Sequence, residues 1–375
     1  MQRDLLRLTG FLKNRIFAGP KHVSINLTNQ CNFNCLYCSL HSKLKKVRRS
    51  EQEFYMSFNI FKNIVDDCSS LNVAQITLLG KGEPFLHPHI YDMIEYVKAK
   101  KIKLSFCTNG SFDIKEIRLL SKVDDFNINL SSAREKTFRN LQYNDRNVFD
   151  DIHNKIKVLS GIKRIQGFPK IRVVYLINAL NFLEIEDMLK IGRDYALDYI
   201  EFRLMFATSD TESLILDRNK AIKLHSNLKK IINQNDPFLK RSNLLYLYGI
   251  ISRMKSGKDD AFRDSSGRDN NLTYYRKIFN NQFKCCAGWF YVAIDIDGNV
   301  YSCCHYVDIL TAGNIYKNSF KEIWRSKKFS AVRKKMKYSM SIKDELWQKC
   351  HNCTRYAFLE GMFKKAKNMP KAIIQ

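Results

Sequence analysis

The sequence lacks any apolar run long enough to cross a bilayer. A membrane-spanning helix needs about 18 or more consecutive apolar residues, and the apolar stretches of this chain are shorter and broken by charge. The N-terminus also lacks the pattern of a signal peptide, because residues 1–13 interleave charged side chains with leucines. We therefore expect a soluble, cytoplasmic protein.

Acidic residues are scarce as well. The 37 Asp and Glu residues are outnumbered by 63 Lys and Arg residues, which gives a net charge of +26. Such a charge attracts phosphates, anionic membranes or acidic partners without distinguishing among them. The 375 residues are 45% hydrophobic, so the chain can bury a large core, and disorder as its main state is excluded.

The eleven cysteines are an odd number in a long chain. This count argues against the disulfide framework of small secreted domains. It favours metal or redox chemistry in a reducing compartment.

Short apolar or alternating runs recur with amphipathic helical stretches between them, which favours parallel β/α units. The expected strands are 22–28, 75–80, 102–107, 126–131, 171–177 and 199–205. Six such units predict an α/β fold with a partial, TIM-like (β/α)6 barrel. In this architecture the loops that follow the strands build the active site.

The alternation of strands and helices ends after the sixth strand. A helical pattern and a polar, linker-like stretch come next, followed by two short strands around Asp297-Gly298-Asn299, a hairpin signal. The expected organisation is an N-terminal extension (1–21), the barrel (22–206), a helical connection with a polar linker (207–284) and a small C-terminal domain (285–375).

Three cysteines, Cys31, Cys35 and Cys38, follow the first strand with C-x3-C-x2-C spacing. Thiolates are the preferred ligands of iron–sulfur clusters, and three of them leave one iron of a [4Fe–4S] cluster open. An open iron can chelate a substrate or cofactor. The motif, with Tyr37 before its last cysteine, resembles that of the radical S-adenosylmethionine (SAM) enzymes; a zinc site or incidental thiols are the alternative.

The resemblance extends to the loops after later strands. Gly80-Lys81-Gly82-Glu83-Pro84 is similar to the GGEP motif of the family, although Lys81 interrupts the glycine pair, and Thr108-Asn109-Gly110 is similar to its TNG turn. The resemblance implies SAM contacts from Tyr37, Gly80, Gly82, Glu83, Pro84, Asn109, Ser131, Ser132, Asn178 and Arg203. Arg134 and Asn181 are further candidates, and pairing of a barrel arginine with a structural carboxylate is the alternative.

A second group of cysteines lies in the C-terminal region. Gly298 stands five residues before Cys303, and the pattern resembles the SPASM/twitch auxiliary-cluster domain. That resemblance implies one fully ligated [4Fe–4S] cluster on Cys285, Cys303, Cys350 and Cys353. Cys286 and Cys304 are alternative ligands one residue away. Leu359 and Phe363 occupy positions where the full motif has cysteines, so a second auxiliary cluster is not expected, and a zinc ribbon is the other interpretation.

Two remaining cysteines receive separate interpretations. Cys68 lies on the apolar face of a predicted helix and is expected in the core. Cys107 ends the third strand, close to the expected substrate. It, or a spare Cys286 or Cys304, could donate a hydrogen atom to a substrate radical.

The family resemblance implies an enzyme that reductively cleaves SAM to a 5′-deoxyadenosyl radical and abstracts hydrogen from a sugar-like small molecule or a peptide. Dehydrogenase, epimerase and peptide-maturase activities fit, with the auxiliary cluster handling an electron and flavodoxin or ferredoxin as reductant. Only about twenty residues precede the first strand, so a separate leader-peptide-binding domain is not expected. This favours a small molecule, or a peptide bound without such a domain.

Two competing functions remain. Basic clusters at residues 43–49 and 333–337 suggest a nucleic-acid partner or an RNA-modifying enzyme, but no aromatic-interleaved RNA-binding signature accompanies them. A non-catalytic iron–sulfur or zinc protein is the other alternative, and the open-site cysteine pattern beside Gly82-Glu83-Pro84 argues against it.

Overall fold

The computed structural model describes residues 2–45, 52–142, 148–205, 210–255, 284–303, 310–338, 361–362 and 364–365. Within these ranges nine strands form one sheet in the order β6-β5-β4-β3-β2-β1-β7-β8-β9. The strands are β1 (His22–Asn26), β2 (Gln75–Leu79), β3 (Lys103–Thr108), β4 (Asp125–Asn129), β5 (Lys170–Ile177), β6 (Tyr199–Leu204), β7 (Tyr291–Ile294), β8 (Asn299–Tyr301) and β9 (Thr311–Asn314).

Helices connect and cover these strands. They are α1 (Gln2–Lys13), α2 (Phe58–Ser70), α3 (Ile90–Ala99), α4 (Ile117–Leu120), α5 (Glu135–Gln142), α6 (Phe149–Gln166), α7 (Ile185–Asp194), α8 (Arg218–Asn233), α9 (Leu244–Lys255), α11 (Ala287–Phe290), α12 (Phe320–Arg325) and α13 (Lys327–Tyr338).

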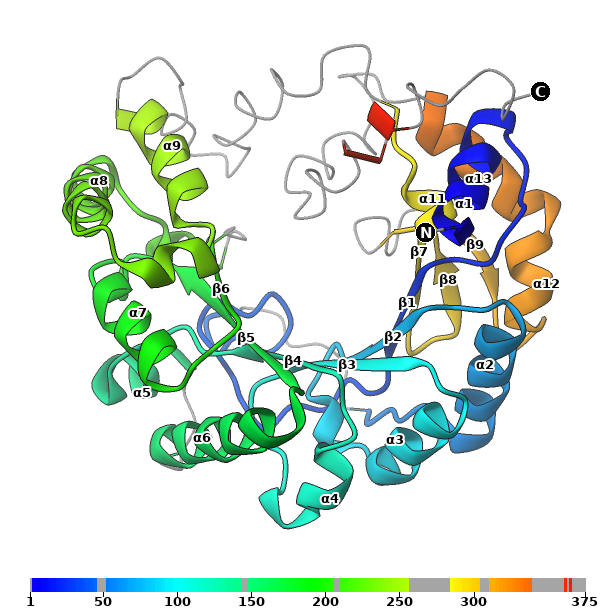
Figure 1. Cartoon of the computed structure of the whole chain (residues 1–375), viewed down its shortest axis with the longest axis horizontal. Helices are drawn as coiled ribbons and strands as arrows, with labels where there is room; N and C mark the ends of the chain where they lie inside the picture. The colour runs from blue at the N-terminus through cyan, green and yellow to red at the C-terminus, as the bar shows by residue number, and fades with distance from the viewer. Residues whose placement is uncertain are drawn as a thin grey trace.

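Strands β1 to β6 form the predicted partial barrel. Each pairs in parallel with the next strand along the chain, and Figure 1 shows them as an arc with α2, α3, α6 and α7 on its outer side. The six predicted strands are confirmed, each boundary within two residues. Because all six run in one direction, the loops that follow them meet at one edge of the sheet.

The C-terminal region extends the same sheet. Strand β7 pairs in parallel with β1, and β8 and β9 then pair antiparallel. The predicted hairpin is therefore present, with Gly298 at its turn at φ +79°, a conformation that glycine adopts readily. The sequence did not reveal that β7 joins the barrel directly.

Helix α1, at the N-terminus, packs against the C-terminal region. The rings of Phe11 and Trp289 meet edge to face at 5.3 Å, and the Trp289 indole donates to the Arg15 carbonyl at 2.9 Å. The Lys337 ammonium of α13 donates to the carbonyls of Phe11 and Leu12. Since the last carbonyls of a helix have no partner within it, Lys337 caps the end of α1.

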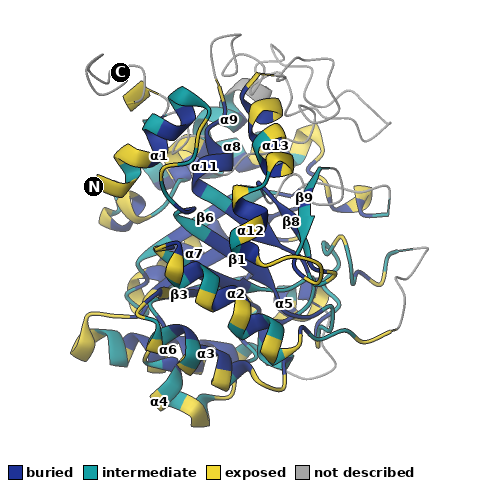
Figure 2. Cartoon of the chain, turned by 90° about the vertical axis from the view of Figure 1, so that its right-hand side faces the viewer, coloured by how far each residue is buried: buried dark blue, intermediate teal, exposed yellow. Residues whose placement is uncertain are grey.

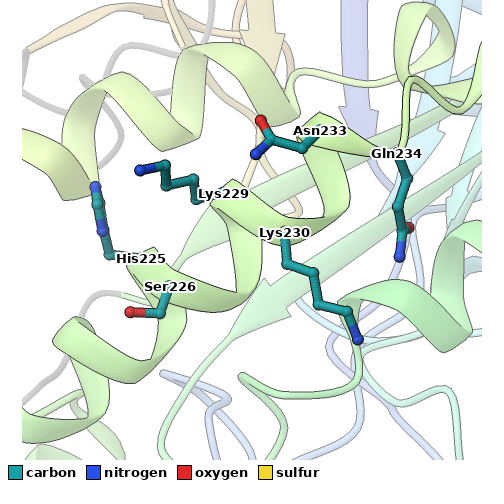
Figure 3. A pocket seen from close by; sticks show the side chains of 6 residues that line it. All are labelled: His225, Ser226, Lys229, Lys230, Asn233 and Gln234. Atoms are coloured by element: carbon teal, nitrogen blue, oxygen red, sulfur yellow. The ribbon is translucent and has the colours of Figure 1, made fainter.

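Helices α8 and α9 pack together beyond β6. A hollow on the surface of α8 is lined by His225, Ser226, Lys229, Lys230, Asn233 and Gln234 (Figure 3). These lining side chains include no thiol, so the hollow lacks the ligands that iron–sulfur clusters prefer.

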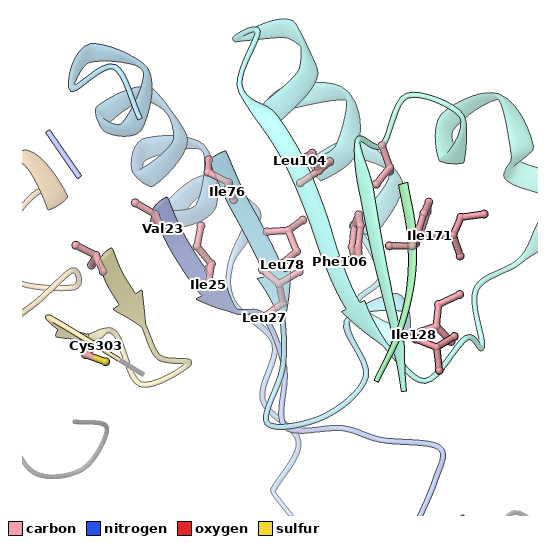
Figure 4. Packing of buried hydrophobic residues seen from close by; sticks show 14 of the residues in the cluster. Val23, Ile25, Leu27, Ile76, Leu78, Leu104, Phe106, Ile128, Ile171 and Cys303 are labelled. Carbon is pink, nitrogen blue, oxygen red and sulfur yellow. The ribbon is translucent and has the colours of Figure 1, made fainter. Parts of the chain in front are cut away.

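The core lies between the sheet and the helices. On each barrel strand one set of alternating side chains is buried and apolar, including Val23, Ile25, Ile76, Leu78, Leu104 and Phe106 (Figure 4). Figure 2 shows buried residues, in dark blue, along the strands inside the molecule. Helix α2 buries Phe61, Ile64, Val65 and Cys68, which confirms the core position expected for Cys68. The intervening side chains of the strands face the opposite, concave side of the sheet.

Candidate active site

The concave face of the barrel carries polar side chains. Ser24, Thr77 and Ser105 lie in register on β1, β2 and β3, and all three are buried. Farther along, Asn127 of β4 donates to the Ser105 hydroxyl at 3.0 Å and lies in register with Cys107 of β3. The barrel therefore presents hydrogen-bonding groups toward its interior.

The predicted cysteine loop follows β1 at the edge where the strands end. Cys31, Cys35 and Cys38 are partly buried, and the backbone nitrogens of Leu40 and His41 donate to the Cys38 sulfur at 3.4 and 3.2 Å. Burial raises the pKa of the Cys31 thiol to about 12, and it also raises the pKa of Cys35. A metal that binds these thiols must displace their protons.

The Gly80–Pro84 loop after β2 packs against this cysteine loop. The nitrogen of Gly82 donates to the Thr28 carbonyl at 3.0 Å, and that of Glu83 donates to the Gln30 carbonyl at 2.7 Å. A Cβ atom on Gly82 would lie 1.9 Å from the Gln30 oxygen. Only glycine permits so close an approach of the two backbones.

The Glu83 carboxylate joins this loop to the turn after β3. It accepts hydrogen bonds from the Thr108 hydroxyl at 2.7 Å, the Asn109 nitrogen at 2.7 Å and the Phe85 nitrogen at 3.2 Å. Glu83 is only 2% exposed, and burial raises its pKa to about 7 despite these hydrogen bonds. The structure thus places Glu83 and Asn109 together.

The Asn109 side chain completes the link to the cysteine loop. Its Nδ2 donates to Asn32 Oδ1 at 2.9 Å, and its Oδ1 accepts from the Ser111 nitrogen at 2.9 Å. Gly110 follows at φ +89°, which favours glycine in this turn. The loops after β1, β2 and β3 therefore form one hydrogen-bonded unit.

The serines after β4 are buried beside the asparagines after β5. The Ser131 hydroxyl accepts from the Leu176 nitrogen at 3.1 Å, and Asn181 Nδ2 donates to the Ser131 carbonyl at 2.6 Å. The Asn178 side chain bonds to backbone atoms of Leu176 and Leu180. Among the described residues, the buried Ser132 hydroxyl has no hydrogen-bond partner.

Both arginines singled out in the sequence pair with carboxylates. Arg203 of β6 bonds to Glu201 through Nε at 2.8 Å and Nη2 at 2.7 Å. Arg134 pairs with Asp187 of α7 at 2.7 Å. These are the structural pairings that the sequence left open as the alternative to ligand contacts.

The C-terminal cysteines are described in part. Cys285 and Cys286 precede β7, and Cys303 follows β8; all three are buried. Because β7 and β8 are antiparallel, residues before β7 and after β8 lie at the same end of the hairpin. Burial raises the pKa of Cys286 to about 12. Cys304, Cys350, Cys353, Leu359 and Phe363 lie outside the described residues, as do residues 256–283, which contain most of the predicted polar linker.

Part of the basic cluster at 333–337 is not on the surface. Arg333 is 2% exposed and donates to the carbonyls of Gly288 and Trp324, both at 2.9 Å. Lys337 is also buried against α1. These two cations support packing of the C-terminal helices, which leaves only Lys334 and Lys335 of this cluster exposed. Residues 46–49 of the other cluster lie outside the described part.

The residues fit the groups that the sequence implied. The cysteine loop offers three soft ligands, with backbone amides aimed at the Cys38 sulfur. The three cysteines share one loop, but within the described ranges no three His, Cys, Asp or Glu side chains converge closely enough to hold a single metal ion. The close approach of Gly82 to the Gln30 backbone and the buried Ser132 hydroxyl suit a ligand bound beside the cysteine loop.

The sequence missed the roles of two residues. In the sequence Thr108 belongs to a turn motif, whereas in the structure its hydroxyl donates to Glu83. Lys81 interrupts two glycines in the sequence, whereas in the structure its ammonium pairs with Asp295 at 2.5 Å. No local pattern relates residues so far apart in the sequence.

Two family models match the chain. The model described as the radical SAM superfamily matches residues 25–194, and an iron–sulfur cluster-binding domain, SPASM, matches residues 285–354. No helix in the described residues is long and apolar enough to cross a membrane.

Individual relatives agree with these models. The chain is 26% identical over 196 residues to a probable GTP 3′,8-cyclase of Methanocaldococcus jannaschii, covering 51% of this chain and 62% of the cyclase. It is 25% identical over 314 residues to the subtilosin biosynthesis protein AlbA of Bacillus subtilis, covering 83% of this chain and 60% of AlbA. The matches thus span about three fifths of the length of these relatives.

A solved structure shares the fold. Streptococcus suis SuiB, bound to its precursor peptide SuiA, aligns with a TM-score of 0.61 at 13% identity, covering 92% of this chain and 74% of SuiB. The family matches also imply the cofactors, which are SAM and a [4Fe–4S] cluster in the barrel and iron–sulfur in the SPASM domain. The chain belongs to the radical SAM superfamily and carries a C-terminal SPASM domain.

Proposed function

We propose that this enzyme is a peptide maturase that uses SAM and one auxiliary [4Fe–4S] cluster. The observation that carries the proposal is the hydrogen-bonded unit of the loops after β1, β2 and β3, in which Glu83 holds Thr108 and Asn109 beside the cysteine loop. This unit lies at the edge of the sheet where β/α barrels place their active sites.

The proposed roles in the barrel follow from this geometry. Cys31, Cys35 and Cys38 would hold a [4Fe–4S] cluster through three thiolates, which would leave one iron without a cysteine ligand and able to bind SAM. Glu83 receives the SAM amino group, while the backbone from Gly80 to Pro84 and the Asn109 turn shape the pocket around it. When bound, SAM supplies a radical that removes a hydrogen atom from the substrate. The polar groups on the concave face offer hydrogen bonds that would orient that substrate.

The remaining candidate residues are proposed either to contact SAM directly or to order the backbone around it. The unpartnered, buried Ser132 hydroxyl suits a ribose contact, and Tyr37 lies between two of the cysteines. Ser131 and Asn178 order the backbone around that site through the bonds described above. Arg203 reaches a ligand only together with its partner Glu201, so the two present a neutral pair.

The auxiliary cluster is proposed to be held by Cys285, Cys303, Cys350 and Cys353. Four thiolates would occupy every iron position, so a cluster held by these residues would have no open iron for substrate and would serve electron transfer. Cys107 is a candidate hydrogen-atom donor on the concave face of β3. An acidic reductant such as flavodoxin or ferredoxin suits the net charge of +26.

Relatives favour a peptide over a sugar or nucleotide substrate. The match to AlbA, a bacteriocin biosynthesis protein, covers 83% of the chain, whereas the match to the probable GTP cyclase covers 51%. The SuiB fold neighbour is bound to a precursor peptide.

Anaerobic reconstitution tests the proposal. We expect about eight irons per chain, release of 5′-deoxyadenosine from SAM after reduction, and a mass change in a candidate precursor peptide. Ala replacement of Cys31, Cys35 and Cys38 should abolish SAM cleavage. Ala replacement of Cys350 and Cys353 should spare cleavage but abolish the peptide product. Zinc in place of iron, or no SAM cleavage by the intact enzyme, would overturn the proposal.

A further inference from the structure

An ion pair joins the Gly80–Pro84 loop of the barrel to the C-terminal hairpin. Lys81 Nζ lies 2.5 Å from Asp295 Oδ2. Lys81 belongs to the loop after β2, and Asp295 directly follows β7. Since β1 lies between β2 and β7 in the sheet, the lysine spans the end of β1 to reach its partner.

Asp295 is built into a buried, fixed site. Its side chain is 0% exposed, and Oδ1 accepts from Asn26 Nδ2 at 3.1 Å and from the Ile296 nitrogen at 2.8 Å. Its backbone bonds to Asn299 and Gly298 within the hairpin. A buried carboxylate without a cation is strongly unfavourable, so Asp295 requires the Lys81 ammonium.

The backbone of Lys81 contacts the segment that follows the cysteine loop. His41, three residues after Cys38, bonds through Nε2 to the Lys81 carbonyl at 2.8 Å. The next residue, Gly82, is held against the Thr28 carbonyl. Lys81 therefore connects the cysteine loop, the glycine loop and the hairpin.

We propose that Lys81 is a positioning residue for SAM. Its ion pair with Asp295 fixes the Gly80–Pro84 loop against the cysteine loop, so that the C-terminal domain helps to shape the SAM site. This inference rests on the proposed role of Glu83 and its loop in SAM binding. Lys81, which separates Gly80 from Gly82, would thus have a structural role at the SAM site.

A double-mutant cycle tests the proposal. Lys81→Met, Asp295→Asn and the double variant are compared with the intact enzyme after anaerobic reconstitution. The affinities for SAM and S-adenosylhomocysteine are measured by calorimetry, and KM and kcat are measured for SAM cleavage. We expect Lys81→Met to weaken binding of both ligands and raise KM by about tenfold to a hundredfold, with a smaller change in kcat. The double variant should be no weaker than Lys81→Met, because both changes break the same contact.

Lys337→Met is the matched control. It also removes a lysine that joins the C-terminal region to another part of the chain, but its contacts are with the end of α1. It should lower the unfolding midpoint and leave SAM affinity unchanged. If Lys81→Met likewise affects only stability, or if its effect and that of Asp295→Asn are additive, the positioning role is wrong. If the intact enzyme binds no SAM, the proposed function fails instead.

Discussion

The Glu83 carboxylate accepts a hydrogen bond of 2.7 Å from the backbone nitrogen of Asn109, which joins the loop after β2 to the turn after β3. This contact fixes two backbone segments that are 26 residues apart. A carboxylate held in this way is oriented before any ligand arrives, which lowers the cost of binding a cation.

The Glu83 carboxylate should make SAM binding depend on pH. Its pKa is about 7 in the SAM-free protein, so its charged fraction increases from pH 6 to pH 8. If the carboxylate binds the SAM amino group, affinity rises over this range and levels off above it. Glu83→Gln should weaken binding by about tenfold or more and remove this dependence. Calorimetry at pH 6, 7 and 8 measures both effects, and an unchanged pH profile in the variant would contradict the assignment.

Gly82→Ala should disrupt the SAM site. The added Cβ would lie 1.9 Å from the Gln30 carbonyl oxygen, so the two loops must separate. We expect a large loss of SAM affinity, measured by calorimetry, with the barrel still folded by circular dichroism. Gly161→Ala, in α6, is the control, because no atom lies within 4 Å of the Cβ that this change would add. That variant should keep SAM affinity and gain about 0.5–1 kcal/mol of stability. Equal SAM affinities in the two variants would argue against a role for the Gly82 contact in SAM binding.

His153 should make the fold sensitive to acid. It is 7% exposed, and burial lowers its pKa to about 4 from 6.5. The unfolded chain therefore binds more protons between pH 6.5 and 4, so stability falls as the pH falls through this range. The expected contribution is about 2 kcal/mol at pH 5. Denaturant unfolding at pH 7 and 5 should show a smaller loss for His153→Gln than for the unmodified chain. Identical losses would place the acid sensitivity elsewhere.

Single replacements should distinguish the neighbouring cysteines before β7. We expect Cys285→Ala to lose about four of eight irons, because the SPASM spacing assigns Cys285 as a ligand. Cys286→Ala should keep its iron and lose only packing, since Cys286 is fully buried. Iron analysis with electron paramagnetic resonance of reduced samples separates the two cases. The opposite pattern would move the ligand assignment by one residue.

Much of the barrel could be predicted from the chain. The strand ranges were predictable because buried parallel strands are short apolar runs between amphipathic helices. The cysteine spacing and the Gly82-Glu83-Pro84 sequence indicated the chemistry because both lie directly after strands, where barrel active sites form. The apolar face of α2, with Cys68 on it, followed from helical periodicity.

Other features were beyond local patterns. The basic cluster at 333–337 looked like one surface, but Arg333 and Lys337 turn inward to bond backbone carbonyls. Arg203 looked available for a ligand, but Glu201 two residues away on the same strand face binds it. Sequence alone does not indicate which charged groups lose water, because that depends on what packs against them.

The sequence by itself determined the strand and helix alternation, the position of three cysteines directly after the first strand and the family, since these depend on residue type and spacing along the chain. Only the tertiary structure decided that β7 extends the barrel beside β1, and that Lys81 thereby meets Asp295. The physical reason is that an ion pair between residues 214 positions apart (295 − 81) forms only after strand pairing has brought them within a few ångströms.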